Sequence, residues 1–285
     1  MQNIKKNLSQ FLKKILRSIW FSRSKFLNIP LPCFLPLKKL FLAYGDEIGA
    51  SIFLKKYENE WKIMPKILKE GMVFFDIGAN QGFYSLLASS CVGKQGKVFA
   101  FEPVPNEFKK LKRNIILNRL KNVQPEQIAI GAENGLTNLF ICLNGKEAYS
   151  SLKEPNIKVA KKKISVLIST LDDYLQKNDL DRLDFIKIDV EGGELNVLKG
   201  AINVLKNLRP LIMCELSDAR TKPWGYEAFS IYKFLLTQDY CLFRHTSENL
   251  LEPAPIKEKY DPEWENLIAL PKEKINQTMK LLNKN

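Results

Sequence analysis

The sequence VFFDIGANQGFYS, residues 73–85, sets the frame for the rest of the chain. An apolar run before Asp76 predicts a buried strand, and apolar residues with helical spacing resume at Phe83. Gly78 and Gly82 lie between them and allow a tight turn that a ligand can approach closely. The free N–H groups at the start of the helix favour a ligand that accepts hydrogen bonds or carries negative charge. The stretch therefore predicts the nucleotide-binding turn of an open α/β sheet.

A second apolar run, residues 97–101, ends at Glu102. Glu102 follows Asp76 by 26 residues. In doubly wound nucleotide-binding folds, an acidic residue at the end of the second strand accepts hydrogen bonds from the ribose hydroxyls. A solvated charge at a strand end is the alternative, but the spacing from the glycine turn favours the ribose role.

Further apolar runs alternate with helix patterns and predict an α/β domain. The predicted strands are residues 123–130, 139–143, 164–168, 183–188, 210–216, 240–243 and 266–270. Gln127 and Ala129, near the end of the first of these, are expected beside an adenine ring. The last two runs are close in sequence, which predicts an antiparallel hairpin at the edge of the sheet.

Three carboxylates are expected at the carboxyl ends of neighbouring strands, where ligands bind in open α/β sheets. Asp189 and Glu191 belong to the sequence LDFIKIDVEGGE, residues 183–194, and Glu215 ends the next strand. Either Asp189 or Glu191 is a candidate general base, or two of the three hold a divalent cation. For Glu191, an interaction with the dipole of the helix that follows is an equal alternative. His245, the only histidine, is a weaker candidate base.

The chemistry of the glycine turn bears on which nucleotide it binds. A dinucleotide turn normally reads G-x-G-x-x-G, whereas this turn has an acid, Asp76, at the strand end. A carboxylate there would repel a pyrophosphate but suits a ligand with a cationic amino-acid moiety. The sequence has no P-loop lysine motif for ATP. These features favour S-adenosylmethionine, which has an ammonium, a sulfonium and a ribose but no phosphate.

Three segments of the sequence resemble those of a known protein family. They are residues 75–82, the Glu102-Pro103 pair with Pro105 and Asn114 after it, and residues 186–194 with 198–201, followed by Pro210 and Glu215. Together they resemble the FkbM-type S-adenosylmethionine-dependent methyltransferases from about residue 58 to residue 271. The second acidic turn is the most specific part, and Gly193 departs from it because the family more often has alanine there.

The resemblance implies a Rossmann-like class I methyltransferase fold, with a seven-stranded, mostly parallel sheet and an antiparallel edge strand. It also implies methyl transfer to a hydroxyl of a saccharide or another small metabolite. The predicted catalytic residues are Asp189, Glu191 and Glu215. The predicted cofactor-binding residues are Asp76, Gly78, Ala79, Asn80, Gly82, Phe83, Tyr84, Glu102, Pro103, Gln127, Ala129 and Asp189. The acceptor is expected near Ser150, Ser151 and Trp224.

The net charge of +13 is concentrated at the N-terminus, where residues 1–45 hold nine Lys or Arg and no Asp or Glu. The other 240 residues have a net charge of only +4, so no nucleic-acid partner is expected. Five scattered cysteines without C-x-x-C spacing indicate free thiols in a reducing compartment, hence a cytoplasmic location. The single histidine excludes a multi-histidine metal site within one chain.

Apolar residues from Ile4 to Trp20 recur at three- and four-residue steps among lysines, which predicts a basic amphipathic helix. Interrupting charges exclude a membrane span and a good signal peptide. The helix either packs on the domain or between two copies of a homodimer, or attaches peripherally to an anionic membrane. We divide the chain into this segment, residues 1–45, and a methyltransferase domain, residues 46–285.

Three functional classes follow. The first is an S-adenosylmethionine-dependent O-methyltransferase acting on a glycan or a small metabolite, with a divalent metal possible but not supported. The second is an NAD-type dinucleotide-binding oxidoreductase, which the turn chemistry disfavours. The third is an inactive binding protein on the same fold, against which the intact acidic and glycine positions argue.

Overall fold

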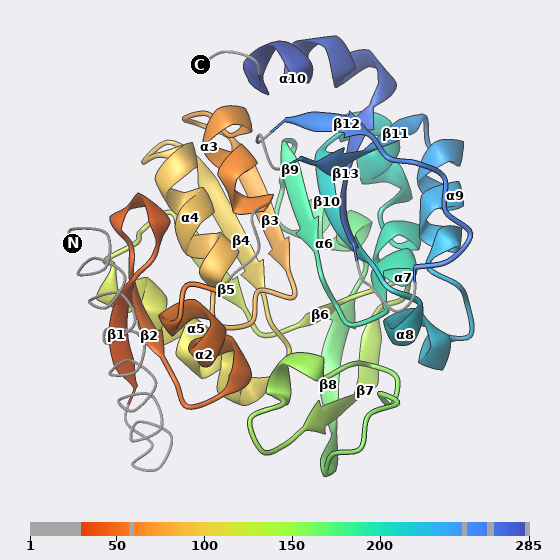
Figure 1. Cartoon of the computed structure of the whole chain (residues 1–285). Coiled ribbons are helices and arrows are strands. Elements are labelled where there is room, and N and C mark those ends of the chain that lie inside the picture. The colour runs from red at the N-terminus through yellow and green to blue at the C-terminus, as the bar shows by residue number, and fades with distance from the viewer. Residues whose placement is uncertain (1–29, 57–59, 247–249, 261–264, 283–285) are drawn as a thin grey trace, which may run out of the picture.

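A computed structural model describes residues 30–56, 60–246, 250–260 and 265–282, and the predicted N-terminal helix lies outside these residues. Within these residues the central sheet, drawn in Figure 1, contains eight strands. In spatial order they are β12 (Leu251–Pro253), β11 (Tyr240–His245), β13 (Glu265–Pro271), β10 (Leu211–Leu216), β9 (Phe185–Ile188), β3 (Val73–Ile77), β4 (Lys97–Phe101) and β5 (Val123–Glu126).

The predicted fold class is confirmed, because β5, β4, β3, β9 and β10 pair in parallel. Three details of the sheet differ from the prediction, the first being that it has eight strands and not seven, because β12 adds to β11. The antiparallel strand β13 lies between β10 and β11, and β12 rather than the β11–β13 pair forms the edge. All but the first residue of β13 are buried, as expected for a strand covered on both faces.

Helices cover both faces of the sheet (Figure 1). On one face lie α3 (Met64–Ile67), α4 (Phe83–Val92), α5 (Pro105–Leu117) and α10 (Ile275–Leu282). On the other lie α6 (Leu171–Lys177), α7 (Glu194–Lys199), the π-helix η4 (Val204–Leu208) and α9 (Phe229–Thr237). Phe74 and Phe75 illustrate the alternation of a strand, since they are fully buried in these two different clusters.

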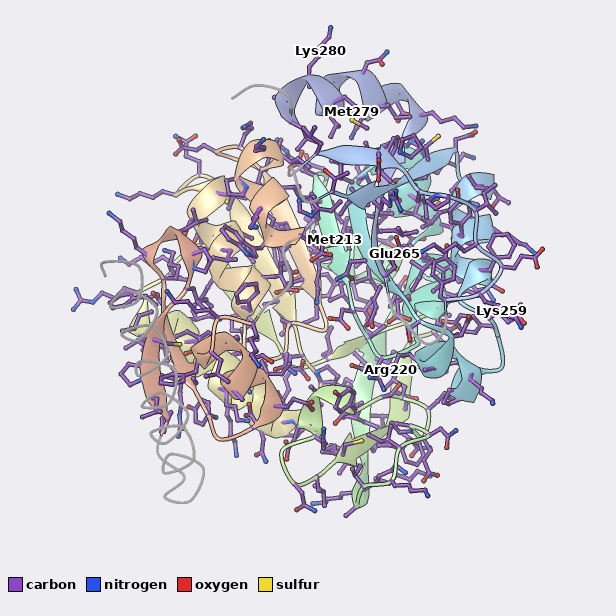
Figure 2. The ribbon with its side chains drawn as sticks, viewed as in Figure 1. Met213, Arg220, Lys259, Glu265, Met279 and Lys280 are labelled. Atoms are coloured by element: carbon purple, nitrogen blue, oxygen red, sulfur yellow. The ribbon has the colours of Figure 1, made fainter. Side chains whose placement is uncertain are left out.

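Short helices occupy the connections. They are η1 (Pro36–Lys38), α2 (Glu47–Phe53), η2 (Glu60–Ile63), η3 (Glu147–Tyr149), α8 (Asp218–Thr221), η5 (Lys222–Trp224) and η6 (Lys272–Lys274). Figure 2 shows Met213 of β10 in the middle of the molecule and Lys280 extending outward from α10. Within the described residues, no helix is long and apolar enough to cross a membrane.

A smaller sheet has the order β6 (Ala129–Ile130), β8 (Lys161–Ser169) and β7 (Gly135–Cys142). The chain predicted as one strand over residues 123–130 therefore contributes to two sheets. Its first half, β5, ends the central sheet, and its second half, β6, pairs with β8. The chain changes sheet just after Glu126, the last residue of β5, whose carbonyl accepts a hydrogen bond from Glu102 N–H at 3.0 Å.

The described part of the N-terminal segment is a hairpin of β1 (Leu31–Phe34) and β2 (Leu40–Ala43). It is fixed to α5 by side-chain amides. Asn118 accepts a hydrogen bond from Leu40 N–H at 2.9 Å and donates one to the Leu40 carbonyl at 2.6 Å, and Asn114 accepts from Leu42 N–H at 2.9 Å. Residues 31–43 thus pack directly on the methyltransferase domain.

Candidate functional site

A cavity of about 620 Å³ lies at the carboxyl ends of β3, β4 and β9. This volume falls in the usual range for small-ligand sites. The structure places these predicted site residues on its wall: Gly78, Ala79, Asn80, Phe83, Tyr84, Glu102, Pro103, Ala129, Asp189 and Glu191. It does not place Asp76, Gly82, Gln127 or Glu215 there.

The turns after β3 and β9 are in close contact. Gly78 has φ +81°, and a Cβ at this position would lie 1.8 Å from the carbonyl oxygen of Asp189. Asp189 N–H in turn donates to the Ile77 carbonyl at 3.0 Å. Glycine is therefore required at position 78 both for its conformation and for the approach of the second turn. The contact fixes the two halves of the cavity floor relative to each other.

Asp76 lies beneath the turn and not on the cavity wall. Its side chain is 1% exposed, and Ser85 Oγ donates to Oδ2 at 2.5 Å. Burial raises the pKa of Asp76, while the Lys187 charge opposes this shift. The Asp76 carboxyl therefore joins β3 to α4. From the sequence we expected it to contact the cofactor, but in the structure it does not line the cavity.

Gly82 and Gln127 also differ from their predicted roles. Gly82 precedes α4 with φ +93°, and a Cβ there would lie 2.6 Å from Leu111 Cδ1, so it serves the packing of α4 on α5. Gln127 is exposed because the chain leaves the central sheet after Glu126. Ile128 and Ala129 line the cavity in its place.

Glu102 lies at the end of β4 and is 5% exposed. Asn80 N–H donates to its Oε2 at 2.7 Å, and Val104 N–H donates to its Oε1 at 2.8 Å. Each carboxyl oxygen keeps a further lone pair, so both can accept from the two hydroxyls of a ribose. Burial raises the pKa of Glu102 to about 8, although both backbone hydrogen bonds act to lower it.

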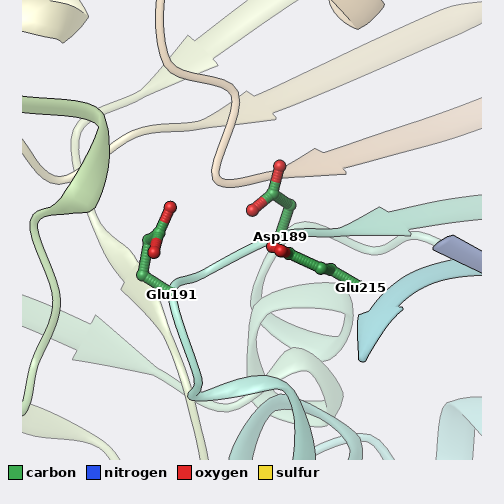
Figure 3. Close-up of side chains that lie close together, drawn as sticks. All are labelled: Asp189, Glu191 and Glu215. Carbon is green, nitrogen blue, oxygen red and sulfur yellow. The ribbon is translucent and has the colours of Figure 1, made fainter. Parts of the chain in front are cut away.

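Asp189 and Glu215 form a hydrogen-bonded carboxyl pair (Figure 3). Lys187 Nζ donates to Asp189 Oδ2 at 2.8 Å. Burial acts to raise the pKa of Asp189, but Lys187 and the hydrogen bond from Glu215 hold it below its ordinary value. Burial and the Asp189 charge raise the pKa of Glu215 well above its ordinary value. The opposite shifts indicate that, within the pair, Glu215 holds a proton more tightly than Asp189, whose carboxylate lines the cavity.

Two acidic residues of the turn after β9, Glu191 and Glu194, have different roles. Glu191 lines the cavity, and its Oε2 lies 2.9 Å from Arg220 Nε. Burial raises its pKa to about 8, against the opposing charge of Arg220. Glu194 is 2% exposed and accepts from Val190 N–H at 2.9 Å and Gly192 N–H at 3.2 Å. Glu194 thus holds the turn closed and does not reach a ligand.

The three carboxylates do not make a convincing metal centre. One oxygen from each of Asp189, Glu191 and Glu215 lies within 4.8 Å of the others. However, Lys187 and Arg220 already supply two positive charges to the group, and burial raises the pKa of Glu215 well above its ordinary value, which disfavours its ionised form. A cation would have to displace these partners, so we assign no metal here. His245, at the end of β11, is not among the residues that line the cavity.

The α2 wall of the cavity was missed by the sequence analysis. Glu47, Ile48, Ser51 and Ile52 of this helix line the cavity, followed by Lys56. The sequence carries one signal of this helix. Asp46 caps it by accepting from Gly49 N–H, at the three-residue spacing typical of an N-cap.

Gln81, in the nucleotide-binding turn, connects α2 to α5. Its Nε2 donates to Asp46 Oδ2 at 2.8 Å and to Glu107 Oε2 at 3.0 Å. Lys110 donates to the same two carboxylates at 2.6 Å and 2.7 Å. This buried network fixes α2 directly over the glycine turn.

The mouth of the cavity is formed by the η3 segment and η5. Ser150, Ser151 and Trp224, expected near the acceptor, all line the cavity. Ser151 Oγ and Trp224 Nε1 both donate to the Glu191 carbonyl, at 2.8 Å and 3.3 Å. Tyr149 of η3 stacks under the Arg220 guanidinium, 4.4 Å from the ring centroid. A polar, aromatic rim thus faces Asp189.

Comparisons with known proteins found a matching family model and several relatives. A family model described as the methyltransferase FkbM domain matches residues 76–244. Methyltransferase 1 of Beauveria bassiana is 28% identical, over 51% of this chain and 64% of its own length. The hexuronic acid methyltransferase AglP of Haloferax volcanii is 28% identical, over 59% of this chain and 66% of its own. The match thus spans less than two thirds of each of these relatives.

Among solved structures, the methyltransferase FkbM from Methylobacillus flagellatus is similar to this chain. The two are 14% identical over 78% of this chain and 52% of that one, with a TM-score of 0.43.

Proposed function

Because this chain belongs to the FkbM family of S-adenosylmethionine-dependent methyltransferases, we propose that it methylates a hydroxyl oxygen of a saccharide or a small metabolite. The observation that carries the proposal is the Asp189 carboxyl group at the cavity wall, which accepts a hydrogen bond from Lys187 Nζ at 2.8 Å; this cation helps to hold the pKa of Asp189 below its ordinary value. A hydroxyl acceptor needs a group to take its proton, and an ionised carboxylate at the reacting end of the cavity can do so. The membership in this family displaces the oxidoreductase alternative.

The residues of the cavity divide into cofactor and acceptor parts. Bound S-adenosylmethionine supplies a methyl group on a positively charged sulfur, which an oxygen nucleophile takes as the carbon–sulfur bond breaks. Glu102 would accept hydrogen bonds from its ribose, and the backbone of Gly78 to Asn80 leaves room for its methionine part. Asp189 would accept the proton of the acceptor hydroxyl, and Lys187 keeps its carboxylate in place. Much of the rate would come from positioning of the acceptor.

Two observations support a saccharide acceptor. The mouth of the cavity combines hydroxyls, Ser150 and Ser151, with an aromatic ring, Trp224, and charged side chains, Lys153 and Glu191. Such a surface can hydrogen-bond several hydroxyl groups and stack on the face of a sugar ring. One relative is named as a hexuronic acid methyltransferase, which makes uronic acids and their glycosides the first acceptors to test.

The test is methyl transfer by the full chain with labelled S-adenosylmethionine and a set of uronic acids, neutral sugars and hydroxylated metabolites. Mass spectrometry should show an increase of about 14 daltons in one acceptor class, with label in an O-methyl group. Asp189→Asn should lower kcat by roughly 100-fold or more, because the base is lost. Asp181→Asn, an exposed aspartate before the other end of β9, is the matched control and should keep full activity. Equal activity of the two variants would remove Asp189 as the base, and methylation of nitrogen or carbon would overturn the proposal.

A further inference from the structure

One surface of the molecule, away from the cavity, combines positive charge with exposed apolar side chains. It is formed by the outer face of α5, the residues that follow it to Lys121, and the β1–β2 hairpin. We call it the α5–hairpin surface. Its exposed cations are Lys38, Lys109, Lys112, Arg113, Arg119 and Lys121. Its exposed apolar side chains are Phe34, Leu37, Ile116 and Leu117.

The charge of the α5–hairpin surface is unopposed by exposed acids. In residues 30–45 and 105–121 the one acidic residue is Glu107. Its side chain is buried, and its carboxylate accepts hydrogen bonds from Lys110 and Gln81. The surface therefore presents only positive charge to the solvent.

The apolar part of this surface is unusual for the molecule. In the described part of the chain, nine large apolar side chains are exposed, and four of them lie on these two elements. Ile116 is 74% exposed and Phe34 is 70% exposed. Lys109, Lys112 and Ile116 follow one another at helical steps, so they share one face of α5.

The structure holds the hairpin and α5 together as one surface. The two hydrogen bonds between Asn118 and the backbone of Leu40 place the tip of the hairpin beside the end of α5. At that tip, Leu37 and Lys38 have φ of 56° and 57°, in the left-handed region that non-glycine residues rarely adopt. Both side chains are exposed, next to the end of α5, which carries Leu117 and is followed by Arg119.

We propose that the α5–hairpin surface docks on an anionic lipid bilayer. Lysine and arginine attract anionic headgroups, and apolar side chains between them can enter the boundary of the acyl chains. A nucleic acid would satisfy the cations but would leave Phe34, Ile116 and the two leucines uncovered. The chain before Pro30 has seven more Lys or Arg, no Asp or Glu, and apolar residues at helical steps, which continues the same chemistry. This proposal is independent of the acceptor proposed above.

The test compares two matched triple variants of the full chain in sedimentation with vesicles. Lys109→Gln, Lys112→Gln and Ile116→Gln alter the α5–hairpin surface. Lys199→Gln, Ile202→Gln and Lys206→Gln remove the same charge and the same apolar side chain from an exposed stretch elsewhere. Glutamine keeps a good helix propensity in both. The vesicles contain equal parts of phosphatidylcholine and phosphatidylglycerol, with pure phosphatidylcholine as the neutral control.

The α5 triple variant should bind the anionic vesicles roughly 30-fold more weakly than the unmodified chain, from the loss of two lysines alone. The control triple should bind within about twofold of the unmodified chain. The proposal would be overturned if both triple variants bound the anionic vesicles equally well. It would also be overturned if the unmodified chain bound neutral vesicles as well as anionic ones, or bound duplex DNA in preference to vesicles.

A second variant keeps the test decisive if the α5 triple folds poorly. Phe34→Gln with Leu37→Gln alters only the hairpin, leaves every lysine in place, and should also weaken binding to the anionic vesicles. Its affinity for S-adenosylmethionine should stay unchanged, because neither residue lines the cavity. Vesicle binding equal to that of the unmodified chain would exclude the hairpin and contradict the proposal.

Discussion

Glu102 and Asp189 are both acidic residues on the wall of one cavity, but their surroundings shift their pKa values in opposite directions. Glu102 accepts from two backbone N–H groups, no cation in the described part of the chain is in hydrogen-bond contact with it, and burial raises its pKa to about 8. Asp189 is bonded to Lys187 and Glu215, and its pKa falls below its ordinary value. Asp189, held beside Lys187, is therefore the carboxylate that is placed to take up a proton.

The ribose role of Glu102 gives a prediction at this scale. Glu102→Ala should raise the Kd for S-adenosylmethionine by roughly 10- to 100-fold, because hydrogen bonds to a carboxylate are lost. Glu126→Ala, at the end of the neighbouring strand β5 and outside the cavity, is the control. Calorimetric titration measures both. An unchanged affinity in Glu102→Ala would show that the ribose binds elsewhere.

Single residues could be predicted from sequence where the reason was local. Glu102 ends a strand at a characteristic distance from the glycine turn, so its place at the cavity followed from the sequence. Asp76 stands at a strand end as well, but its side chain turns to Ser85 of α4. Which side of the turn a side chain faces depends on the packing of α4, and no local pattern records it.

At the scale of elements, the contact between the β3 and β9 turns leaves no space for a side chain at Gly78. Gly78→Ala should destabilise the fold by about 1–3 kcal/mol more than Gly71→Ala. Both glycines have similar positive φ, +81° and +83°, but a Cβ at Gly71 meets no atom within 4 Å. The pair therefore isolates the clash with the Asp189 carbonyl from the cost of the backbone conformation. Urea denaturation gives the comparison, and equal losses of stability would show that the turns can separate without cost.

The N-terminus of α7 gives a pH-dependent prediction. Burial raises the pKa of Glu194 from an ordinary value of 4.5 to about 7, so the folded state holds its proton more tightly than the unfolded state. The contribution of Glu194 to stability is thus largest below pH 4.5 and is lost as the pH rises to about 7.

Glu194→Gln should remove this pH dependence. Relative to the variant, the unmodified chain should lose up to ~3 kcal/mol of unfolding free energy as the pH rises through this window. Glu258→Gln, at an exposed site, is the control and should run parallel to the unmodified chain. If the unfolding free energy of Glu194→Gln depended on pH in the same way as that of the unmodified chain, the assigned pKa shift of Glu194 would be contradicted. Denaturant titration at several pH values gives the measurement.

Helices and strands were predicted correctly where the sequence pattern is local. The prediction was wrong where it depended on a pairing partner that is distant in the sequence. The parallel strands and their covering helices were predictable from apolar runs and helical spacing. The position of β13 between β10 and β11 was not, because pairing order is decided by partners far along the chain. Its unbroken apolar run, Leu267 to Leu270, is a signal of an interior strand that the prediction of an edge hairpin overlooked.

At the scale of the whole molecule, the cavity is closed by segments far apart in sequence. The α2 helix, the η3 segment and Trp224 of η5 meet over the carboxyl edge of the central sheet. Lys146, just before η3, forms an ion pair with Glu47 of α2 at 2.9 Å, which joins two of these walls. None of these contacts is recorded by a motif, which explains why the sequence located the floor of the cavity and not its walls.

A bound ligand that touches all these segments should stabilise the fold as a whole. At a concentration 100 times its Kd, S-adenosylmethionine should raise the unfolding free energy by about 2.7 kcal/mol. Denaturant titration with and without the ligand gives the comparison. No change in unfolding free energy at that excess would contradict binding to the folded cavity.

Calorimetric titration of the full chain with S-adenosylmethionine and, separately, with NAD tests the identity of the cavity most directly. We expect one S-adenosylmethionine to bind per chain and NAD to give no heat of binding, because the acidic side chains of Glu102, Asp189 and Glu191 line the cavity and disfavour a pyrophosphate. Tight binding of NAD without a response to S-adenosylmethionine would contradict the assignment of this cavity as a methyl-donor site.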